Sequence, residues 1–277
     1  MNSTKFKYIC EFDFSEYDID LDARILRLIE DNKVNDVVTP HTLLMQFGIH
    51  LVDSEKYKIV KRSNLEKYTR YIFFESSLIE GGATFFPHSK DKRSYGLKSG
   101  WCSAMTQGQA LSLALRFYKL NLINKDFLDS ILLSLDPRNN LNYYIISRDG
   151  FLWFEEYPSK PHSFVLNGNI FALFAIYEYL QNFNDLQYQN ILERGISSLY
   201  KILPRFITYN NWTRYDLYKN NYAPMEYHKI HLEQLNFLSG NFPNFKITKQ
   251  LRALHSPPRA LNIRILSRQV LNKVILR

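Results

Sequence analysis

The sequence FEEYPSKPHSFVLNG, residues 154–168, decides how the rest of the chain is organised. Two adjacent carboxylates, Glu155 and Glu156, run into Tyr157 and then into a Pro-x-x-Pro segment. Proline fixes its own φ and disfavours helix at the residue before it, so the segment predicts a rigid loop holding three reactive side chains. This pattern suggests a site. The alternative, two solvated acids in a turn, is left open by spacing alone.

The segments on either side of this loop have different periodicities. Upstream, the strand-like runs NYYIIS and FLWFEE are joined by Asp149-Gly150, which predicts a hairpin that ends at the two glutamates. Downstream, Asn167 is predicted to cap a long apolar helix, 170–180. The free N–H groups of that helix would then face the loop.

Apolar periodicity and capping residues predict further helices along the chain. These are a helix capped by Asp22, one opened by Thr39-Pro40, and others at 65–79, 101–118, 127–135, 189–203 and from about Tyr227. Gly81-Gly82 is predicted to end the helix 65–79, and the basic stretch 83–100 to cross a binding face. Antiparallel helix pairs with short strands between them predict a mainly α fold, an α/α toroid or incomplete α/α barrel with short β-hairpins at the cleft.

The composition is that of an ordinary soluble globule, with 277 residues, 45% hydrophobic and 22% charged. Aromatic residues make up 15% of the chain, which suits stacking on sugars and equally suits aromatic packing between helices. We expect an N-terminal extension at 1–38, a catalytic domain at 39–245 and a basic tail at 246–277. The tail predicts an amphipathic segment that docks on anionic lipid or polymer, or alternatively packs on the domain.

Charge and cysteine content narrow the partners. Lys plus Arg number 35 against 27 Asp plus Glu, so nucleic acid, anionic lipid or an anionic polysaccharide would be attracted. No nucleic-acid motif is present, which disfavours nucleic acid as the partner.

Cys10 and Cys102 form no disulfide framework and no C-x-x-C motif. Because the chain shows neither a signal peptide nor an apolar run long enough to span a bilayer, we expect a cytoplasmic protein, unless a targeting segment has been trimmed away.

Three segments carry a resemblance to a known family. They are the loop at 154–168, GWCSAMTQGQALSLALRFY at 100–118 and PMEYHKIHLEQL at 224–235. Together they resemble the C-terminal catalytic domain of the heparosan-type D-glucuronyl C5-epimerases, and the loop matches the family pattern E-E-Y-P-x-x-P-x-S-F-V-L-N-G at each specified position. The resemblance spans about 39–240 and leaves a homodimer open.

The resemblance implies four catalytic residues, which are Glu156, Tyr157, Tyr215 and Tyr227. A C5 epimerase removes a proton beside a carboxylate and returns one to the opposite face of the ring, which requires two groups on two elements. Glu156 and Tyr227 are far apart in sequence and would meet this requirement. An ordinary glutamate is a weak base near neutral pH, so burial and the neighbouring Glu155 are expected to raise its pKa.

The chain departs from the family where the substrate carboxylate would be bound. The family's Y-D-L-R-H is Y-D-L-Y-K here, with Tyr218 at the arginine position. Lys219 would share a face with Tyr215 on an extended segment and is predicted to replace that arginine, with Arg148 and Arg214 as alternatives. If none of these residues replaces the family's arginine, we expect the activity to be altered.

Further candidate substrate contacts are polar or aromatic residues of the three segments: Trp101, Ser103, Gln107, Asn167, His228 and His231. Each has an alternative as a satisfied core residue. The spacing of the two histidines is compatible with a metal, but no third ligand is in register, so we expect none.

The resemblance implies an isomerase that converts D-glucuronosyl to L-iduronosyl residues without a redox cofactor. Its expected partner is a uronate-containing polysaccharide or lipid-linked glycan, with an anionic membrane surface as a further partner of the tail. Two alternatives remain. A polysaccharide lyase would share the C5 proton abstraction, and a non-catalytic glycan-binding module would explain the absent arginine.

Overall fold

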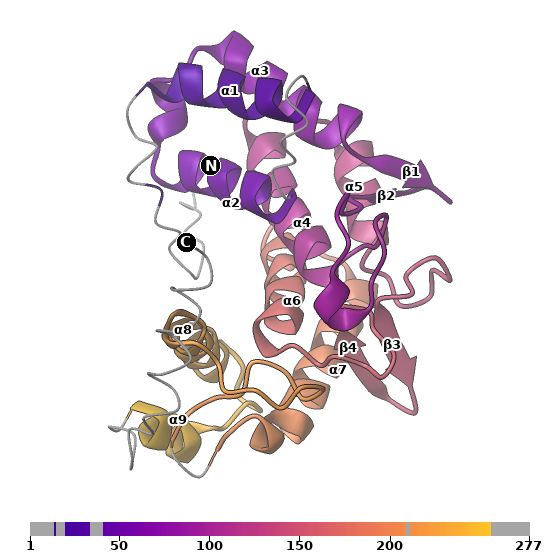
Figure 1. Ribbon diagram of the computed structural model, residues 1–277, viewed down its shortest axis with the longest axis vertical. Helices are drawn as coiled ribbons and strands as arrows, with labels where there is room; N and C mark the ends of the chain where they lie inside the picture. The colour runs from indigo at the N-terminus through magenta and orange to yellow at the C-terminus, as the bar shows by residue number, and fades with distance from the viewer. Residues whose placement is uncertain (1–13, 15–19, 34–40, 209–210, 256–277) are drawn as a thin grey trace.

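The computed structural model describes residue 14 and residues 20–33, 41–208 and 211–255. The predicted mainly α class is confirmed (Figure 1). The helices are α1 (Leu21–Lys33), α2 (His41–Asp53), α3 (Arg62–Arg70), α4 (Ala104–Lys119), α5 (Lys125–Leu133), α6 (Leu166–Leu180), α7 (Leu186–Ile202), α8 (Met225–Asn241) and α9 (Thr248–His255). Two antiparallel hairpins join β1 (Leu78–Glu80) to β2 (Ala83–Phe85) and β3 (Ile145–Arg148) to β4 (Phe151–Phe154).

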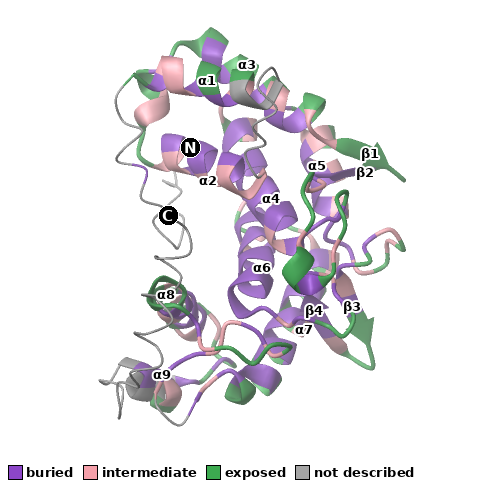
Figure 2. Cartoon of the chain, in the orientation of Figure 1, coloured by how far each residue is buried: buried purple, intermediate pink, exposed green. Residues whose placement is uncertain are grey.

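The helices pack in two rows. Helices α2, α4, α6 and α8 contact one another in that order, while α5 packs on α4, α7 on α6 and α9 on α8. Almost every residue of α4 and α6 is buried (Figure 2). A Cβ at Gly108 would lie 2.8 Å from the Cα of Ala172, so this glycine allows the two helix backbones to approach closely.

A buried ion cluster joins three of these helices at the far end of α4. The Arg116 guanidinium is fully buried and donates to Asp53 at 2.6 and 2.8 Å and to Glu178 at 3.1 and 3.3 Å. Removing one partner of a buried ion pair costs about 3–5 kcal/mol, because the other charge is left uncompensated. The cluster therefore fixes α2, α4 and α6 relative to one another.

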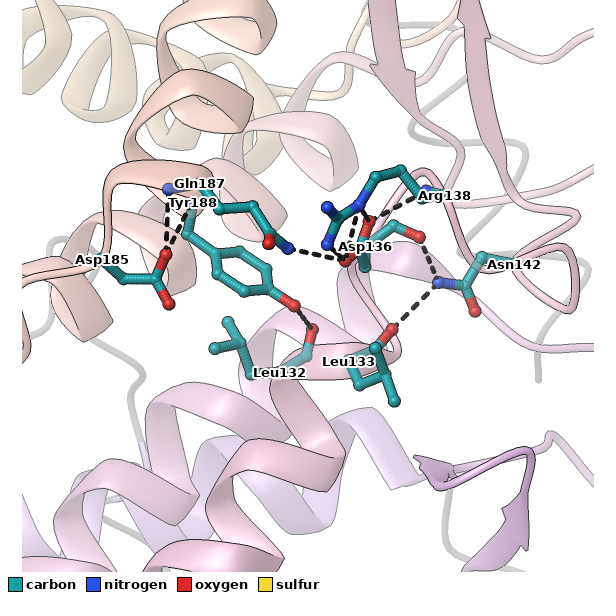
Figure 3. A network of polar contacts seen from close by, with 8 residues as sticks. All are labelled: Leu132, Leu133, Asp136, Arg138, Asn142, Asp185, Gln187 and Tyr188. Atoms are coloured by element: carbon teal, nitrogen blue, oxygen red, sulfur yellow. Dashed lines mark hydrogen bonds and ion pairs between the residues drawn. The ribbon is translucent and has the colours of Figure 1, made fainter.

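A second polar network supports the segment that leads into the β3–β4 hairpin (Figure 3). The buried Asp136 accepts hydrogen bonds from Arg138 and, at 2.9 Å, from Gln187 at the start of α7. Asn142 donates to the backbone carbonyl of Asp136 at 2.8 Å. The network ties the chain after α5 to α7 and thereby supports the hairpin that ends at Phe154, directly before Glu155.

The β3–β4 hairpin confirms one prediction, and the β1–β2 hairpin corrects another. Asp149 and Gly150 both have positive φ and connect β3 to β4. Gly81 and Gly82 also have positive φ but form the turn of a second hairpin rather than the end of a helix. The helix predicted at 65–79 stops early because the chain changes to a π-helical turn at Tyr71–Glu75 and then to β1.

Two predicted caps are wrong. At α1 the side chain of Asp20, not Asp22, accepts from the N–H of Ala23, at 3.1 Å. Asp22 instead accepts from the N–H of Lys61 and from Asn64, which ties α1 to α3. At α6 the N-cap residue is Val165, and Asn167 lies buried inside the first turn.

The ends of the chain are described only in part. The Thr39-Pro40 cap, Cys10 and residues 256–277 of the tail lie outside the described residues. The described part of the tail packs on the domain, where Leu251 and Leu254 of α9 are buried. Among the described helices none is both long and apolar enough to cross a bilayer.

Candidate active site

One cavity of about 430 Å³ opens beside the paired glutamates. It is enclosed by the first turns of α2, by the loop at 88–92, by the start of α4, by the end of the β3–β4 hairpin and by α8. Its lining residues are His41, Thr42, Leu43, Gln46, His88, Ser89, Lys90, Asp91, Lys92, Trp101, Ser103, Met105, Glu156, Tyr157 and Tyr227. The predicted site loop and the third resembling segment therefore reach the same cavity.

The carboxylate of Glu156 is held in a restricted environment. Its side chain is 6% exposed, and its Oε1 accepts a hydrogen bond of 3.1 Å from the hydroxyl of Tyr215. Its Oε2 has no hydrogen-bond partner among the described residues. A Cβ at Gly168 would lie 2.6 Å from that oxygen, so the first turn of α6 must have a glycine here. Burial raises the pKa of Glu156, and the Tyr157 and Tyr215 hydroxyls and the Lys92 charge oppose the rise.

Three tyrosines surround this carboxylate. The hydroxyls of Tyr157 and Tyr215 lie 3.3 Å apart, and the ring of Tyr227 packs edge-on against Tyr215 at 4.9 Å between centroids. Tyr227 is 37% exposed and lines the cavity. Burial and, after it, the charges of Glu156 and Glu226 raise the pKa of Tyr227 above its ordinary value. Tyr227 is therefore a neutral phenol near neutral pH.

The neighbouring Glu155 has a structural position. Its carboxylate accepts hydrogen bonds from the hydroxyl of Ser163 and from the N–H of Phe164, and it does not line the cavity. Burial raises the pKa of Glu155 to about 7, with a smaller contribution from Glu156. Glu155 thus holds the loop in place, and Glu156 faces the cavity.

The cations that line the cavity are not the predicted ones. Lys92 lines it, with its ammonium 4.8 Å from the centre of the Tyr157 ring. Lys219 lies outside the lining, with its ammonium 4.1 Å from the centre of the Tyr95 ring. Arg148 is exposed at the end of β3, and Arg214 donates to the carbonyl of Asn220 at 3.0 Å. Neither arginine reaches the cavity lining, and Tyr218, at the family's arginine position, is also outside it.

Of the remaining predicted contacts, Trp101 and Ser103 reach the cavity. Trp101 stacks on His88 at 4.0 Å, and Ser103 also caps α4. Gln107 is fully buried and donates to the carbonyl of Thr84 at 3.0 Å, which is a core role. Asn167 is buried and does not line the cavity.

The two histidines of α8 are buried and do not line the cavity. The Nδ1 atoms of His228 and His231 are 2.9 and 2.8 Å from the hydroxyl of Thr213. Burial lowers the pKa of His231 to about 3, so its ring is neutral. Within the described residues no cluster of three or more His, Cys, Asp or Glu side chains could hold a metal ion.

Residues that the sequence did not single out complete the cavity wall. His41, Thr42 and Gln46 come from α2, and His88 and Lys92 come from the loop that was predicted to cross a binding face. Burial lowers the pKa of His88 to about 3, so that it offers neutral hydrogen-bonding groups. The basic run after Pro87 indicated that this loop carries cations. Periodicity does not show which of these side chains reaches the cavity.

Comparison with known proteins places this geometry in a family. A family model described as D-glucuronyl C5-epimerase C-terminus matches residues 82–255. A D-glucuronyl C5-epimerase of Caenorhabditis elegans is 28% identical over 252 residues, which cover 79% of this chain and 40% of that relative. The chain thus spans well under half the length of that relative. The resemblance deduced from the three segments is confirmed, and the chain belongs to the family of D-glucuronyl C5-epimerase C-terminal domains.

Proposed function

We propose that this chain epimerises D-glucuronosyl residues of an anionic glycan to L-iduronosyl residues at C5. The observation that carries the proposal is that Glu156 and Tyr227, from separate elements, line one cavity. A two-sided proton transfer needs such a pair. Family membership supports the reaction class, and the glycan is a uronate-containing polysaccharide or a lipid-linked precursor.

Glu156 is the base in the direction from glucuronate to iduronate. Its raised pKa makes its carboxylate a stronger base than that of an ordinary glutamate. The C5–H bond breaks, the proton goes to the Glu156 carboxylate, and the electron pair of that bond spreads into the substrate carboxylate. The substrate then carries the additional negative charge.

Tyr227 delivers the second proton. Its neutral hydroxyl forms a new C–H bond at the opposite face of C5, which inverts that carbon and leaves a tyrosinate. Solvent then returns a proton to Tyr227 and accepts one from Glu156, so no oxidant or reductant is consumed. In the reverse direction the two groups exchange roles.

Lys92 neutralises the substrate carboxylate in place of the family's arginine. Lys92 lines the cavity together with Glu156. The charge of Lys92 lowers the pKa of the Glu156 carboxylate. A cation at the substrate carboxylate stabilises the charge that develops after proton removal, and the loss of one such electrostatic contact typically slows an enzyme by roughly 10²- to 10³-fold. A lysine provides a point charge rather than a bidentate fork, so the contact should be sensitive to salt.

The architecture fits a cleft enzyme. The successive contacts of α2, α4, α6 and α8, with outer helices on them, support an incomplete α/α barrel (Figure 1). The cavity is lined by residues from the first turns of α2, α4 and α8. A cytoplasmic location and the docking of the basic tail on an anionic membrane remain proposals.

The test is the product formed from an unsulfated alternating glucuronate polymer. We expect iduronosyl signals in the proton NMR spectrum and no ultraviolet absorbance from an unsaturated uronate. Unsaturated product would identify a lyase instead. Tight binding of the polymer with unchanged sugar signals would identify a glycan-binding module and reject the epimerase.

A further inference from the structure

The hydroxyl of Thr213 joins two buried histidines that the proposed reaction does not use. Thr213 is fully buried, and its Oγ1 lies 2.9 Å from Nδ1 of His228 and 2.8 Å from Nδ1 of His231. The two histidines are 4% and 0% exposed. Two buried imidazoles therefore share a single buried hydroxyl, and unpaired polar groups are costly in such a place.

The hydroxyl has one hydrogen, so it donates to one imidazole and accepts from the other. Nε2 of His231 has no hydrogen-bond partner among the described residues, and a proton there would be a buried donor without an acceptor. The arrangement that avoids this puts the proton of His231 on Nδ1. His231 then donates to Thr213, Thr213 donates to Nδ1 of His228, and His228 carries its own proton on Nε2.

This chain of hydrogen bonds connects the two segments that carry the reactive tyrosines. Thr213 is two residues before Tyr215, whose hydroxyl donates to Glu156. His228 directly follows Tyr227 in the first turns of α8. The ring of His228 also stacks on the ring of Trp212, with 3.9 Å between the centroids. The contact between the Thr213 segment and α8 is therefore aromatic as well as polar.

Hydrogen bonds also hold the backbone around Thr213. The carbonyl of Thr213 accepts from the N–H of Ala223 at 2.9 Å, and the indole of Trp212 donates to the carbonyl of Ala223 at 2.7 Å. These contacts hold the segment before α8, and the hydroxyl of Thr213 adds hydrogen bonds between that segment and α8. A shift of α8 relative to the Thr213 segment would move Tyr227 relative to Tyr215 and Glu156.

We propose that Thr213 is a positioning residue for epimerisation, and that its hydroxyl holds α8 so that Tyr227 faces Glu156 across the cavity. It acts through His228 and His231 and does not touch the substrate. The proposal rests on the proposed function and adds to it the group that sets the separation of the two proton-transfer residues.

The test compares Thr213→Val, which keeps the shape and removes the hydroxyl, with Thr213→Ser, which keeps the hydroxyl. We expect Thr213→Val to lower kcat by roughly ten- to a hundredfold with KM within about twofold, because misalignment affects the proton transfer more than substrate binding. Thr213→Ser should recover most of kcat. Wild-type kcat in Thr213→Val, or an equal loss in both variants, would overturn the proposal.

A second measurement uses the unaltered protein. Nitrogen-15 NMR of the histidine rings distinguishes protonation at Nδ1 from protonation at Nε2, and we expect His231 and His228 to show opposite tautomers near neutral pH. The same tautomer in both rings would overturn the proposal even if Thr213→Val failed to fold. Opposite tautomers in a wild-type protein that forms no iduronate would reject the proposed function and leave the hydrogen-bond chain intact.

Discussion

The hydroxyl of Tyr215 donates a 3.1 Å hydrogen bond to Oε1 of Glu156, across 59 positions of sequence. This bond connects the loop after the β3–β4 hairpin to the segment before α8. It stabilises the ionised form of a carboxylate whose pKa is raised by burial. The same tyrosine packs against Tyr227, so one side chain contacts both proposed proton-transfer groups.

Glu156→Gln and Tyr227→Phe should each remove epimerisation while leaving the fold intact. Each change removes one proton-transfer group and little volume, and loss of such a group costs roughly 10²- to 10⁴-fold in rate. The measurement is the initial rate of iduronate formation, with circular dichroism as the check on folding. A variant that keeps a near wild-type rate would reject the role assigned to its residue.

Tyr215→Phe should shift the pH dependence of kcat/KM. The hydrogen bond from Tyr215 lowers the pKa of Glu156, so its loss raises that pKa further. Because the base is active when deprotonated, the rate falls as pH falls through this pKa, and the acidic limb should move to higher pH. Tyr95→Phe is the matched control, since its hydroxyl donates to Asp216 at 2.8 Å. An unmoved limb in Tyr215→Phe would contradict the assignment of Glu156 as base.

Lys92→Met and Lys219→Met form a matched pair for the carboxylate-binding role. Lys92 lines the cavity and Lys219 covers the Tyr95 ring outside it. We expect Lys92→Met to lower kcat/KM by about 10²-fold or more and to reduce its salt dependence, with a much smaller effect from Lys219→Met. The opposite order would restore Lys219 as the group that replaces the family's arginine.

Glu155 should make the protein less stable at high pH. Its pKa is about 7 in the folded state against 4.5 as its ordinary value, so the folded state binds the proton more tightly. The stability gained from that proton is fully present below about pH 4.5 and is lost as pH rises through about 7, by about 3 kcal/mol at most. In urea unfolding, Glu155→Gln should therefore lose less stability than the wild type between pH 5 and pH 8. Equal pH dependence in both proteins would contradict the raised pKa.

Local sequence signals predicted the parts of the fold that depend on local chemistry. Asp149-Gly150 predicted the β3–β4 hairpin because both residues tolerate positive φ. Gly81-Gly82 carries the same chemistry, but the apolar spacing before it resembled one long helix, and the π-helical turn at Tyr71–Glu75 has no local sequence signal. Asn167 looked like a cap because Asn often caps helices, whereas packing buries it inside α6.

The candidate site shows the same division. The segments that carry Glu156 and Tyr227 were identifiable because their residue types recur together in the family. The position of Lys92 depends on how the loop at 88–101 closes, with the N–H of His88 donating to the carbonyl of Trp101 at 2.8 Å. The role of Thr213 depends on α8 packing against a segment that precedes it. No periodic pattern in the sequence indicates either the position of Lys92 or the contacts of Thr213.

The central claim is that C5 loses and regains a proton between Glu156 and Tyr227, and exchange with solvent tests it most directly. The protein is incubated with a glucuronate polymer in deuterated water, and deuterium at C5 is measured by NMR or mass spectrometry. The account predicts deuterium at C5 of the iduronosyl residues formed by the wild type, and no deuterated iduronosyl residue with Glu156→Gln or Tyr227→Phe. A folded wild-type protein that binds the polymer and leaves hydrogen at every C5 would contradict it.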